Sequence, residues 1–403
     1  MIGVNEAIKT VLSKTRNLSE QTILLNKSLG RVTSKNIYAK LNNPPENVSS
    51  MDGYAVKSSN LKNISKIAIK VIGESSAGKP YKKKIKNFEC IQIFTGAKVP
   101  KETDIILLQE NVLIKNNTLT YTTQKPVKGQ YIRKKGSNFK KNSIIIKKNE
   151  LLTSRKIGLA LSANNTNVNV YKKPKVAILA TGNELKKPGQ NIRSGIISSN
   201  TLLLISIINS IGAISTDLGS ARDTIKSLKN KLRNINNYDI LITTGGASVG
   251  KHDLVKEVLI QLGMKLIFWK VAMRPGKPLI FGKLNKTLIL GFPGNPVSAF
   301  VSSIIFAKPL IFKLLKLNHK DEVKKGIITK NLNKNDKRQE YLRAIISYKN
   351  NTYFANPLSA QDSSMNLALS KANGLIVRKA YAPISKKGDK VSIILFSDLH
   401  TNI

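Results

Sequence analysis

The sequence predicts a multidomain protein that combines an α/β region with β-rich regions, and two observations support this prediction. Strand and helix patterns alternate from 174 to about 315, which is typical of a parallel sheet with helices on both faces. Short strand patterns separated by Gly, Pro and Asn fill most of the remaining chain. The 403 residues, 41% of them hydrophobic, suffice for about two to four domains with buried cores.

The first predicted domain is helical and is split by an insertion. It comprises 1–42 and 140–173, because apolar residues recur at helical spacing in 7–12, 29–37 and 151–161. Two consecutive prolines follow the first part, and neither of them can continue a helix.

The other predicted domains follow in chain order. Residues 43–139 are expected to form a β-rich insert, because its strand patterns are short and are separated by turn residues. Residues 174–320 form the expected α/β domain, in which ligands bind beyond the carboxyl ends of the strands. Residues 321–403 return to short strands and are expected to form a small β-barrel.

The composition limits the classes of partner and the compartment. The net charge of +44 comes from lysines spread over the whole chain, and only 6% of residues are aromatic. We therefore expect no specific nucleic-acid binding, which would need a basic patch with stacking aromatics. We expect no membrane span, because the apolar stretches are short and interrupted by serines. One cysteine and the absence of a signal-peptide pattern favour the cytoplasm.

A glycine-rich loop after a buried strand pattern is the first candidate site. The segment Asp239–Asp253 reads DILITTGGASVGKHD, and its apolar part ends in glycine before a helical pattern. Backbone N–H groups at such a junction can hold a phosphate, so we assign substrate binding to Gly245, Gly246, Ser248 and Gly250. The loop lacks the Ser or Thr of a P-loop. From spacing alone, it is either a ligand site or a tight structural turn.

Three acids follow predicted parallel strands and form the second candidate site. Glu184, Asp223 and Asp253 are expected at one edge of the sheet, where carboxylates can hold Mg²⁺ or position a water for attack on a phosphoanhydride. The structural alternative is that Asp223 caps a helix and Glu184 is a loop residue.

Two turns supply the remaining candidates for substrate binding. Arg274 and Lys277 flank a Pro-Gly turn, and two cations on a stiff turn suit an oxyanion. The turn PGNPVS contributes Pro293, Pro296 and Ser298, the last near a predicted helix N-terminus. A purely structural role is the alternative for both turns.

These segments together resemble the molybdopterin molybdenumtransferase family, which includes MoeA and the E domain of gephyrin. The resemblance rests on SSMDGYAV, FTGAKVP, TGNEL with its following PG, SSNTLLL, TTGGASVG, VAMRPGKP and GFPGNPVSA, in the family's order. It implies that the chain joins molybdate to adenylylated molybdopterin with release of AMP, using a divalent metal such as Mg²⁺. It also implies a homodimer with a cleft shared between subunits, and a layout of four parts that matches the domains above.

The resemblance also assigns roles to particular residues and reveals two departures. It implies a catalytic role for Asp52, Thr95, Glu184, Asp223 and Asp253, and further functional positions at Lys277, Pro293 and Pro296. Asn183 stands where the family usually has an aspartate, and its lost charge is expected to weaken metal binding. Asn138 likewise replaces an acid.

Two other functions remain as alternatives. The α/β region alone also resembles molybdopterin adenylyltransferase, although that enzyme lacks the MDGYAV insert and the C-terminal β region. A non-catalytic scaffold is the second alternative, against which the retained acids argue. The adenylyltransferase and other proteins of the same pathway are the expected partners besides a second copy of the chain.

Overall fold

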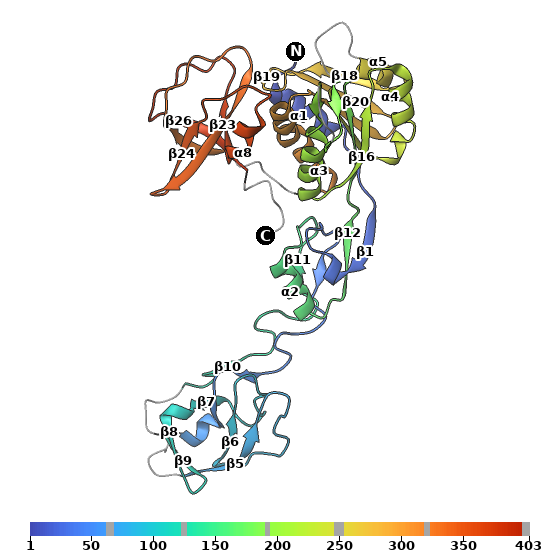
Figure 1. Cartoon of the computed structure of the whole chain (residues 1–403). Coiled ribbons are helices and arrows are strands. Elements are labelled where there is room, and N and C mark those ends of the chain that lie inside the picture. Colours follow the sequence, from blue (N-terminus) through green and yellow to red (C-terminus); the bar gives the residue numbers. More distant parts are fainter. Residues whose placement is uncertain (62–67, 122–126, 190–193, 246–253, 318–322, 397–403) are drawn as a thin grey trace.

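The structure of the chain is a computed structural model in which four regions follow one another in space (Figure 1). The insert lies at one end, the split region lies in the middle, and the α/β region and the C-terminal barrel lie side by side at the other end. The described residues are 1–61, 68–121, 127–189, 194–245, 254–317 and 323–396.

The insert is built on a six-stranded sheet with the order β7-β4-β6-β5-β9-β8. Its alternating apolar residues form one small core on each side of the sheet, around Cys90 and around Ile91. The cysteine is fully buried, and this burial raises the pKa of its thiol to about 12. The strands are β3 (Val48–Ser49), β4 (Gly53–Val56), β5 (Ile69–Ser75), β6 (Glu89–Ile93), β7 (Ile105–Leu108), β8 (Val112–Lys115), β9 (Thr118–Tyr121) and β10 (Ile132–Arg133).

The split region contains one helix of its own and two short strand pairs. Strand β1 (Glu20–Leu24) pairs with β12 (Asn167–Tyr171), and β2 (Ile37–Tyr38) pairs with β11 (Ile144–Ile146), beside α2 (Ser154–Ser162). The expected helix over 29–37 is wrong. Gly30 has a φ of 70°, and the segment ends in β2, because β-branched residues there pack as strand on the core of the region.

The first helix, α1 (Val4–Ser13), packs on the α/β region and not on α2. Its buried side chains Val4, Ala7 and Val11 belong to the same apolar cluster as α7 (Lys308–Leu314). The split region is therefore of mixed strand and helix content, and the N-terminal helix completes the core of its neighbour.

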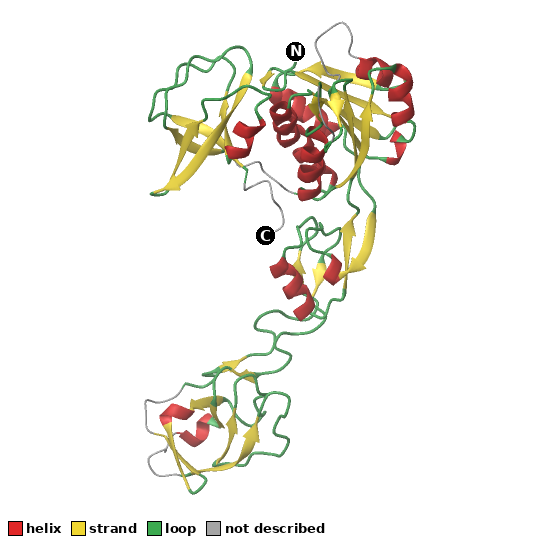
Figure 2. Ribbon diagram, in the orientation of Figure 1, coloured by secondary structure: helices red, strands yellow, loops and turns green. Residues whose placement is uncertain are grey.

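The α/β region has a six-stranded sheet with the order β16-β13-β17-β21-β20-β18. The first four strands are parallel, as expected, whereas β20 runs antiparallel to both of its neighbours, β21 and β18, because a tight turn joins β20 to β21. Helices cover both faces, as Figure 2 shows. The strands are β13 (Lys175–Thr181), β16 (Ile214–Ala221), β17 (Ile240–Thr244), β18 (Lys265–Lys270), β20 (Pro278–Leu284) and β21 (Thr287–Phe292), with the short β14 (Leu185–Lys186), β15 (Ile196–Ile197) and β19 (Met273–Arg274).

The two faces of this sheet carry different helices. The larger cluster holds α1, α3 (Asn200–Ser210), α6 (Pro296–Ser302) and α7, and the smaller one holds α4 (Ile225–Leu232) and α5 (Leu254–Gln261). The run Pro296–Leu314 is long and apolar enough to cross a membrane, but 89% of its most apolar window is buried in the protein. It is therefore the central core helix of this region.

The C-terminal region is a closed barrel, which confirms the predicted β-barrel. Five strands close because β23 pairs with both β24 and β25. Strand β19 of the α/β region extends the same sheet by pairing with β23, so the two regions share backbone hydrogen bonds. The barrel consists of β22 (Lys324–Ile328), β23 (Gln339–Lys349), β24 (Thr352–Pro357), β25 (Gly374–Arg378) and β26 (Lys390–Leu395), with α8 (Asn366–Lys371) between β24 and β25.

Candidate active site

The carboxyl ends of β13 and β17 enclose a cavity of about 160 Å³, here called the strand-end cavity. Gly245 follows β17 with a φ of 87°, and a Cβ atom there would overlap the carbonyl oxygen of Thr181. Only glycine fits, because both the conformation and the space exclude a side chain. Glu184 and Pro296 also line this cavity. The predicted substrate loop thus begins at a real cavity at the carboxyl edge of the sheet.

The predicted acids Glu184 and Asp223 both lie at this edge and are exposed. The carboxylate of Glu184 folds over Gly182, where a Cβ atom would overlap its oxygens. Asp223 pairs with Asn183: the Asn183 backbone N–H donates to Oδ2 of Asp223 at 3.3 Å, and the Asp223 N–H donates to Oδ1 of Asn183 at 3.2 Å. An aspartate oxygen could accept this second bond equally well. The departure at Asn183 therefore removes a charge but keeps the loop geometry.

A second and larger cavity, here called the open cavity, lies beside Asn183. Its volume is about 930 Å³, and it is bordered by the β13–β14 loop, α3 and β16. It shares Leu185 and Ser198 with the strand-end cavity, so the two cavities adjoin at the sheet edge.

Four predicted site residues, Gly246, Ser248, Gly250 and Asp253, lie outside the described residues. The described ranges contain no group of three or more His, Cys, Asp or Glu side chains that could hold a metal ion. The predicted metal site of Glu184, Asp223 and Asp253 therefore stays a prediction.

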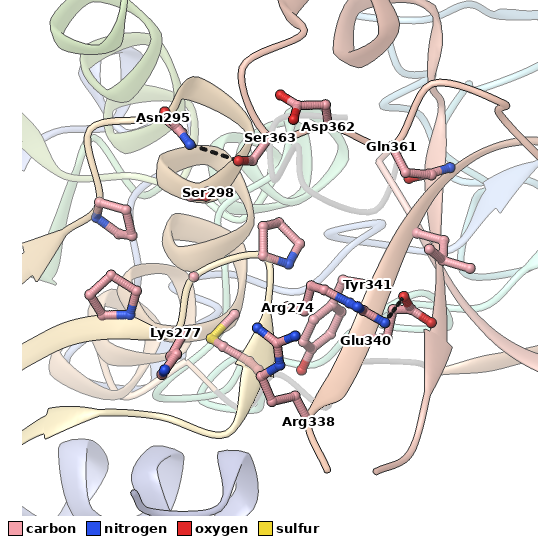
Figure 3. A pocket seen from close by; sticks show the side chains of 16 residues that line it. Arg274, Lys277, Asn295, Ser298, Arg338, Glu340, Tyr341, Gln361, Asp362 and Ser363 are labelled. Carbon is pink, nitrogen blue, oxygen red and sulfur yellow. Dashed lines mark hydrogen bonds and ion pairs between the residues drawn. The ribbon is translucent and has the colours of Figure 1, made fainter. Parts of the chain in front are cut away.

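The cation pocket, about 600 Å³, lies between the α/β region and the barrel (Figure 3). The turn that carries Arg274 and Lys277 forms one side, Pro293 of the β21–α6 turn and the buried Ser298 of α6 form another, and β23 closes it. Lys277 Nζ has no hydrogen bond or ion pair to a described residue. The two predicted turns thus meet at one pocket, whose lining includes an ammonium group that no described residue pairs.

Arg274 differs from Lys277 because carboxylates of the barrel already hold it. Its guanidinium donates to Oε1 of Glu340 at 2.7 Å and to Oδ1 of Asn335 at 3.2 Å, and lies 3.6 Å from Oδ2 of Asp336. Glu340 is buried and also pairs with Arg378 at 3.4 Å. Arg274 therefore joins the α/β region to the barrel, and its charge is largely compensated.

Arg343 is a residue of this pocket region that the sequence did not single out. It is 1% exposed on β23, and its guanidinium donates to the carbonyl oxygens of Ala360 at 2.8 Å and Asp362 at 2.9 Å. Burial lowers the pKa of Arg343. The loop that Arg343 holds also contains Ser363, whose Oγ accepts a hydrogen bond from Nδ2 of Asn295 at 2.7 Å. The sequence feature that could have revealed Arg343 is an arginine inside the apolar pattern YLRAII.

Asp52 and Thr95 form a pair in the insert, at the start of β4 and after β6. Both the backbone N–H and the hydroxyl of Thr95 donate to Oδ1 of Asp52, at 2.7 and 2.8 Å. These two bonds lower the pKa of the exposed Asp52 carboxyl group, so it is ionised at neutral pH. In one chain the insert lies far from the α/β region (Figure 1), so this pair does not reach the strand-end cavity of its own chain.

Comparisons with known proteins match the regions in which these residues lie. A molybdopterin molybdenumtransferase from Haemophilus influenzae is 32% identical over 381 residues, which cover 93% of each chain. This chain belongs to the MoeA family. The molybdopterin molybdenumtransferase from Bacillus subtilis is 28% identical and covers 98% of this chain and 94% of the relative. The family models that match are the MoeA N-terminal region (domain I and II) at 2–164, a probable molybdopterin binding domain at 177–313 and the MoeA C-terminal region (domain IV) at 325–396.

A solved MoeA structure confirms the predicted fold class. The molybdopterin biosynthesis MoeA protein from Pyrococcus horikoshii is 27% identical, and the match covers 98% of this chain and 99% of that chain with a TM-score of 0.85.

Asn138, the second departure from the family pattern, lies where the insert joins the split region. Its backbone N–H donates to the carbonyl oxygen of Asn43 at 2.9 Å. It is thus remote from the strand-end cavity and the cation pocket of the same chain.

Proposed function

We propose that this MoeA family member inserts molybdate into adenylylated molybdopterin and releases AMP. The family is that of the molybdopterin molybdenumtransferases, which act in molybdenum cofactor biosynthesis. One observation carries the assignment of the site: the open cavity, the strand-end cavity and the cation pocket adjoin along one edge of the sheet. The first two share Leu185 and Ser198, and the last two share Asn295. An extended substrate and a small oxyanion could therefore meet near Asn295.

The cation pocket is the proposed site for molybdate. Lys277 offers an ammonium group that no described residue neutralises, and ammonium groups suit oxyanions. Arg274 shapes this pocket through its bonds to Glu340 and Asn335. Arg343 holds the loop that presents Ser363 to the pocket. Molybdate would thus bind between two regions that are fixed to each other.

Glu184 and Asp223, together with Asp253, are the proposed site for the phosphate end of the substrate and for Mg²⁺. Carboxylate oxygens are the ligands that Mg²⁺ prefers, and the exposed acids at the sheet edge fit this preference. When bound, Mg²⁺ would neutralise phosphate charge and so favour breaking of the phosphoanhydride bond. Asn183 holds the Asp223 loop in place through its paired hydrogen bonds.

A homodimer is the proposed working form. The ionised Asp52 and its partner Thr95 lie at the far end of the chain from the strand-end cavity, so a second copy is needed to bring them to it. We place this enzyme in the cytoplasm, with molybdopterin adenylyltransferase as the proposed supplier of the adenylylated substrate. Light scattering should give about twice the 44.4 kDa chain mass.

The adenylyltransferase and scaffold alternatives are not favoured. Family matches extend over the insert and the barrel as well as the α/β region, and the full-length relatives are named as transferases. The decisive experiment measures AMP release and cofactor formation from adenylylated molybdopterin plus molybdate. Cofactor formation that needs molybdate supports the proposal, whereas formation of adenylylated molybdopterin from a nucleotide would favour the adenylyltransferase alternative.

A further inference from the structure

Asn200, the first residue of α3, joins two loops at the carboxyl edge of the sheet. It is 8% exposed, and its Nδ2 donates to Oγ1 of Thr244 at 2.9 Å and to the carbonyl oxygen of Gly294 at 2.6 Å. Thr244 ends β17, and Gly294 lies in the turn after β21, the neighbouring strand. One amide therefore holds both loops that border the strand-end cavity.

The partners of Asn200 fix the orientation of its amide. The carbonyl oxygen of Gly294 can only accept a hydrogen bond, so the amide nitrogen must face it. The hydroxyl of Thr244 donates to the carbonyl of Pro293 at 3.4 Å, and it therefore accepts from Asn200. It follows that Oδ1 of Asn200 faces away from both loops. This atom is buried and has no hydrogen-bond partner among the described residues.

Thr181 adds a second unpaired polar atom at the same cavity. It is 2% exposed, and its Oγ1 likewise has no partner within the described part of the chain. Both Thr181 and Asn200 line the strand-end cavity, next to Glu184 and Gly245. Buried polar side-chain atoms in native proteins nearly always have a partner. Thr181 and Asn200 are thus two residues of one cavity lining whose unpaired polar atoms a bound ligand would complete.

We propose that Asn200 and Thr181 form a hydrogen-bonding subsite for the organic substrate, and that molybdate does not bind there. Molybdate at neutral pH offers only acceptor oxygens, which cannot pair with the carbonyl oxygen of Asn200. A pterin N–H or a ribose hydroxyl can donate to that oxygen, and the Thr181 hydroxyl can donate or accept. The identity of the organic substrate rests on the proposed function, whereas the need for a donor rests on the geometry of Asn200.

The sharpest test compares Thr181→Val with Thr243→Val. Thr243 is fully buried on β17 and its hydroxyl also lacks a described partner, but it does not line the strand-end cavity. Both changes replace a hydroxyl by a methyl group and break no described hydrogen bond, so neither should lower Tm. Thr181→Val should weaken binding of the organic ligand roughly 3- to 10-fold, as expected for one neutral hydrogen bond. Thr243→Val should leave binding within about twofold of the parent protein.

A second pair of variants tests the amide itself. Asn200→Ala removes both the acceptor and the link between the loops. Asn209→Ala removes an exposed asparagine of the same helix that accepts from the backbone N–H and the hydroxyl of Ser215. We expect only Asn200→Ala to weaken binding of the organic ligand, by roughly 10-fold or more because it removes the acceptor and the link together. Neither change should alter the molybdate concentration needed for half-maximal rate.

Calorimetric titrations with AMP alone and with molybdopterin alone identify the donor group. Weaker AMP binding by Thr181→Val and Asn200→Ala points to the ribose, and weaker molybdopterin binding points to the pterin. The inference is overturned if Thr181→Val binds both ligands as the parent protein does, or if the variants raise only the molybdate requirement. Failure of the parent protein to release AMP would refute the proposed function, yet these titrations would still decide the subsite.

Discussion

The cation pocket and the strand-end cavity border the same residue, Asn295, but different parts of the chain build them. The strand-end cavity belongs to the α/β region alone, and its shape depends on backbone that only glycine allows, at Gly245. The cation pocket needs the barrel, which Arg274 and the β19–β23 pairing hold against the α/β region. A single region builds the first site, whereas the second depends on how two regions dock.

This difference predicts that the two sites fail in different ways when they are damaged. Loss of a residue at the strand-end cavity should impair chemistry or organic-substrate binding without loosening the fold. Loss of a residue at the cation pocket should act either on molybdate binding or on docking of the barrel, depending on whether its charge is already compensated. The predictions below are ordered from the largest expected effect to the smallest.

The largest effect is expected from the acids of the proposed shared site. Asp52→Ala and Glu184→Ala should each reduce AMP release by roughly 10²- to 10⁴-fold, the range for loss of a group that acts on the reacting atoms. If two chains share each site, mixed dimers of the two variants contain one intact site. Random exchange of subunits should then restore about a quarter of the parent activity.

The shared site is contradicted if a mixture of the two inactive variants regains no AMP release although mass spectrometry shows that their subunits have exchanged. In that case the pair Asp52–Thr95 and the strand-end cavity do not act in one site. The matched control for Asp52→Ala is Asp389→Ala, since that exposed acid of the barrel accepts a local hydrogen bond from the backbone N–H of Lys386 at 2.7 Å and lines none of the three cavities. This control should keep the parent rate.

The next effect concerns Lys277, the pocket cation without a described partner. Losing a charged contact to an oxyanion costs about 1.5–3 kcal/mol. At about 1.4 kcal/mol per tenfold, Lys277→Ala should raise the molybdate requirement by roughly 10- to 100-fold. Excess molybdate should restore the rate, because the lost term is one of binding. Asp223→Ala should not be rescued in this way, and rescue of Asp223→Ala alone would reverse the two assignments.

The sequence analysis predicted features within the α/β region better than contacts between that region and the barrel. Alternation of strands and helices predicted the α/β region, and the motifs predicted the family and the strand-end residues, because backbone geometry there depends on nearby residues such as Gly245. The pairing of Arg274 with Glu340 was not predictable, since the two residues lie 66 positions apart and meet only through docking. Arg343 was missed for a different reason, since its partners are backbone carbonyl oxygens of a loop in its own region, at Ala360 and Asp362, and carbonyl groups leave no mark in the sequence.

Two errors in the predicted elements have local physical causes. The segment 29–37 has apolar residues at helical spacing, but Gly30 adopts a left-handed conformation and the following β-branched residues pair as strand. The sheet of the α/β region was expected to be parallel throughout. Asn285, with a φ of 51°, allows the tight turn that makes β20 antiparallel to β21.

A smaller effect, on stability and not on binding, is expected for Arg274. Among the described residues, Arg274→Ala leaves the carboxylate of the buried Glu340 with only the 3.4 Å contact to Arg378. The free energy of unfolding should fall by about 1–3 kcal/mol, toward the lower value because the Arg274 side chain is 43% exposed. Urea titration should show this loss, and Lys277→Ala should change stability by less than about 0.5 kcal/mol. Equal losses in the two variants would contradict the distinction between these cations.

The smallest expected effect is a pH dependence of stability, and it concerns Asp336 of the barrel, which lies beside Arg274 of the α/β region. The side chain of Arg338 donates to Asp336 at 2.6 and 3.1 Å, and this bonding lowers the pKa of Asp336 to about 2. A carboxyl group whose pKa is lower in the folded state contributes stability above its unfolded pKa of about 3.9. That contribution should be lost as the pH falls from about 4 to about 2. Since the Asp336 side chain is 40% exposed, the total should stay below about 1 kcal/mol.

Asp336→Asn should remove this part of the acid sensitivity, so parent and variant should differ in unfolding free energy at pH 6 and converge near pH 2. Combining Asp336→Asn with Arg338→Gln should add little further loss, because the first change already breaks the pair. An unchanged difference between parent and Asp336→Asn from pH 6 to pH 2 would show that the carboxylate charge contributes nothing. The docking of the barrel would then depend on Glu340, which bonds both Arg274 and Arg378, and on the β19–β23 pairing.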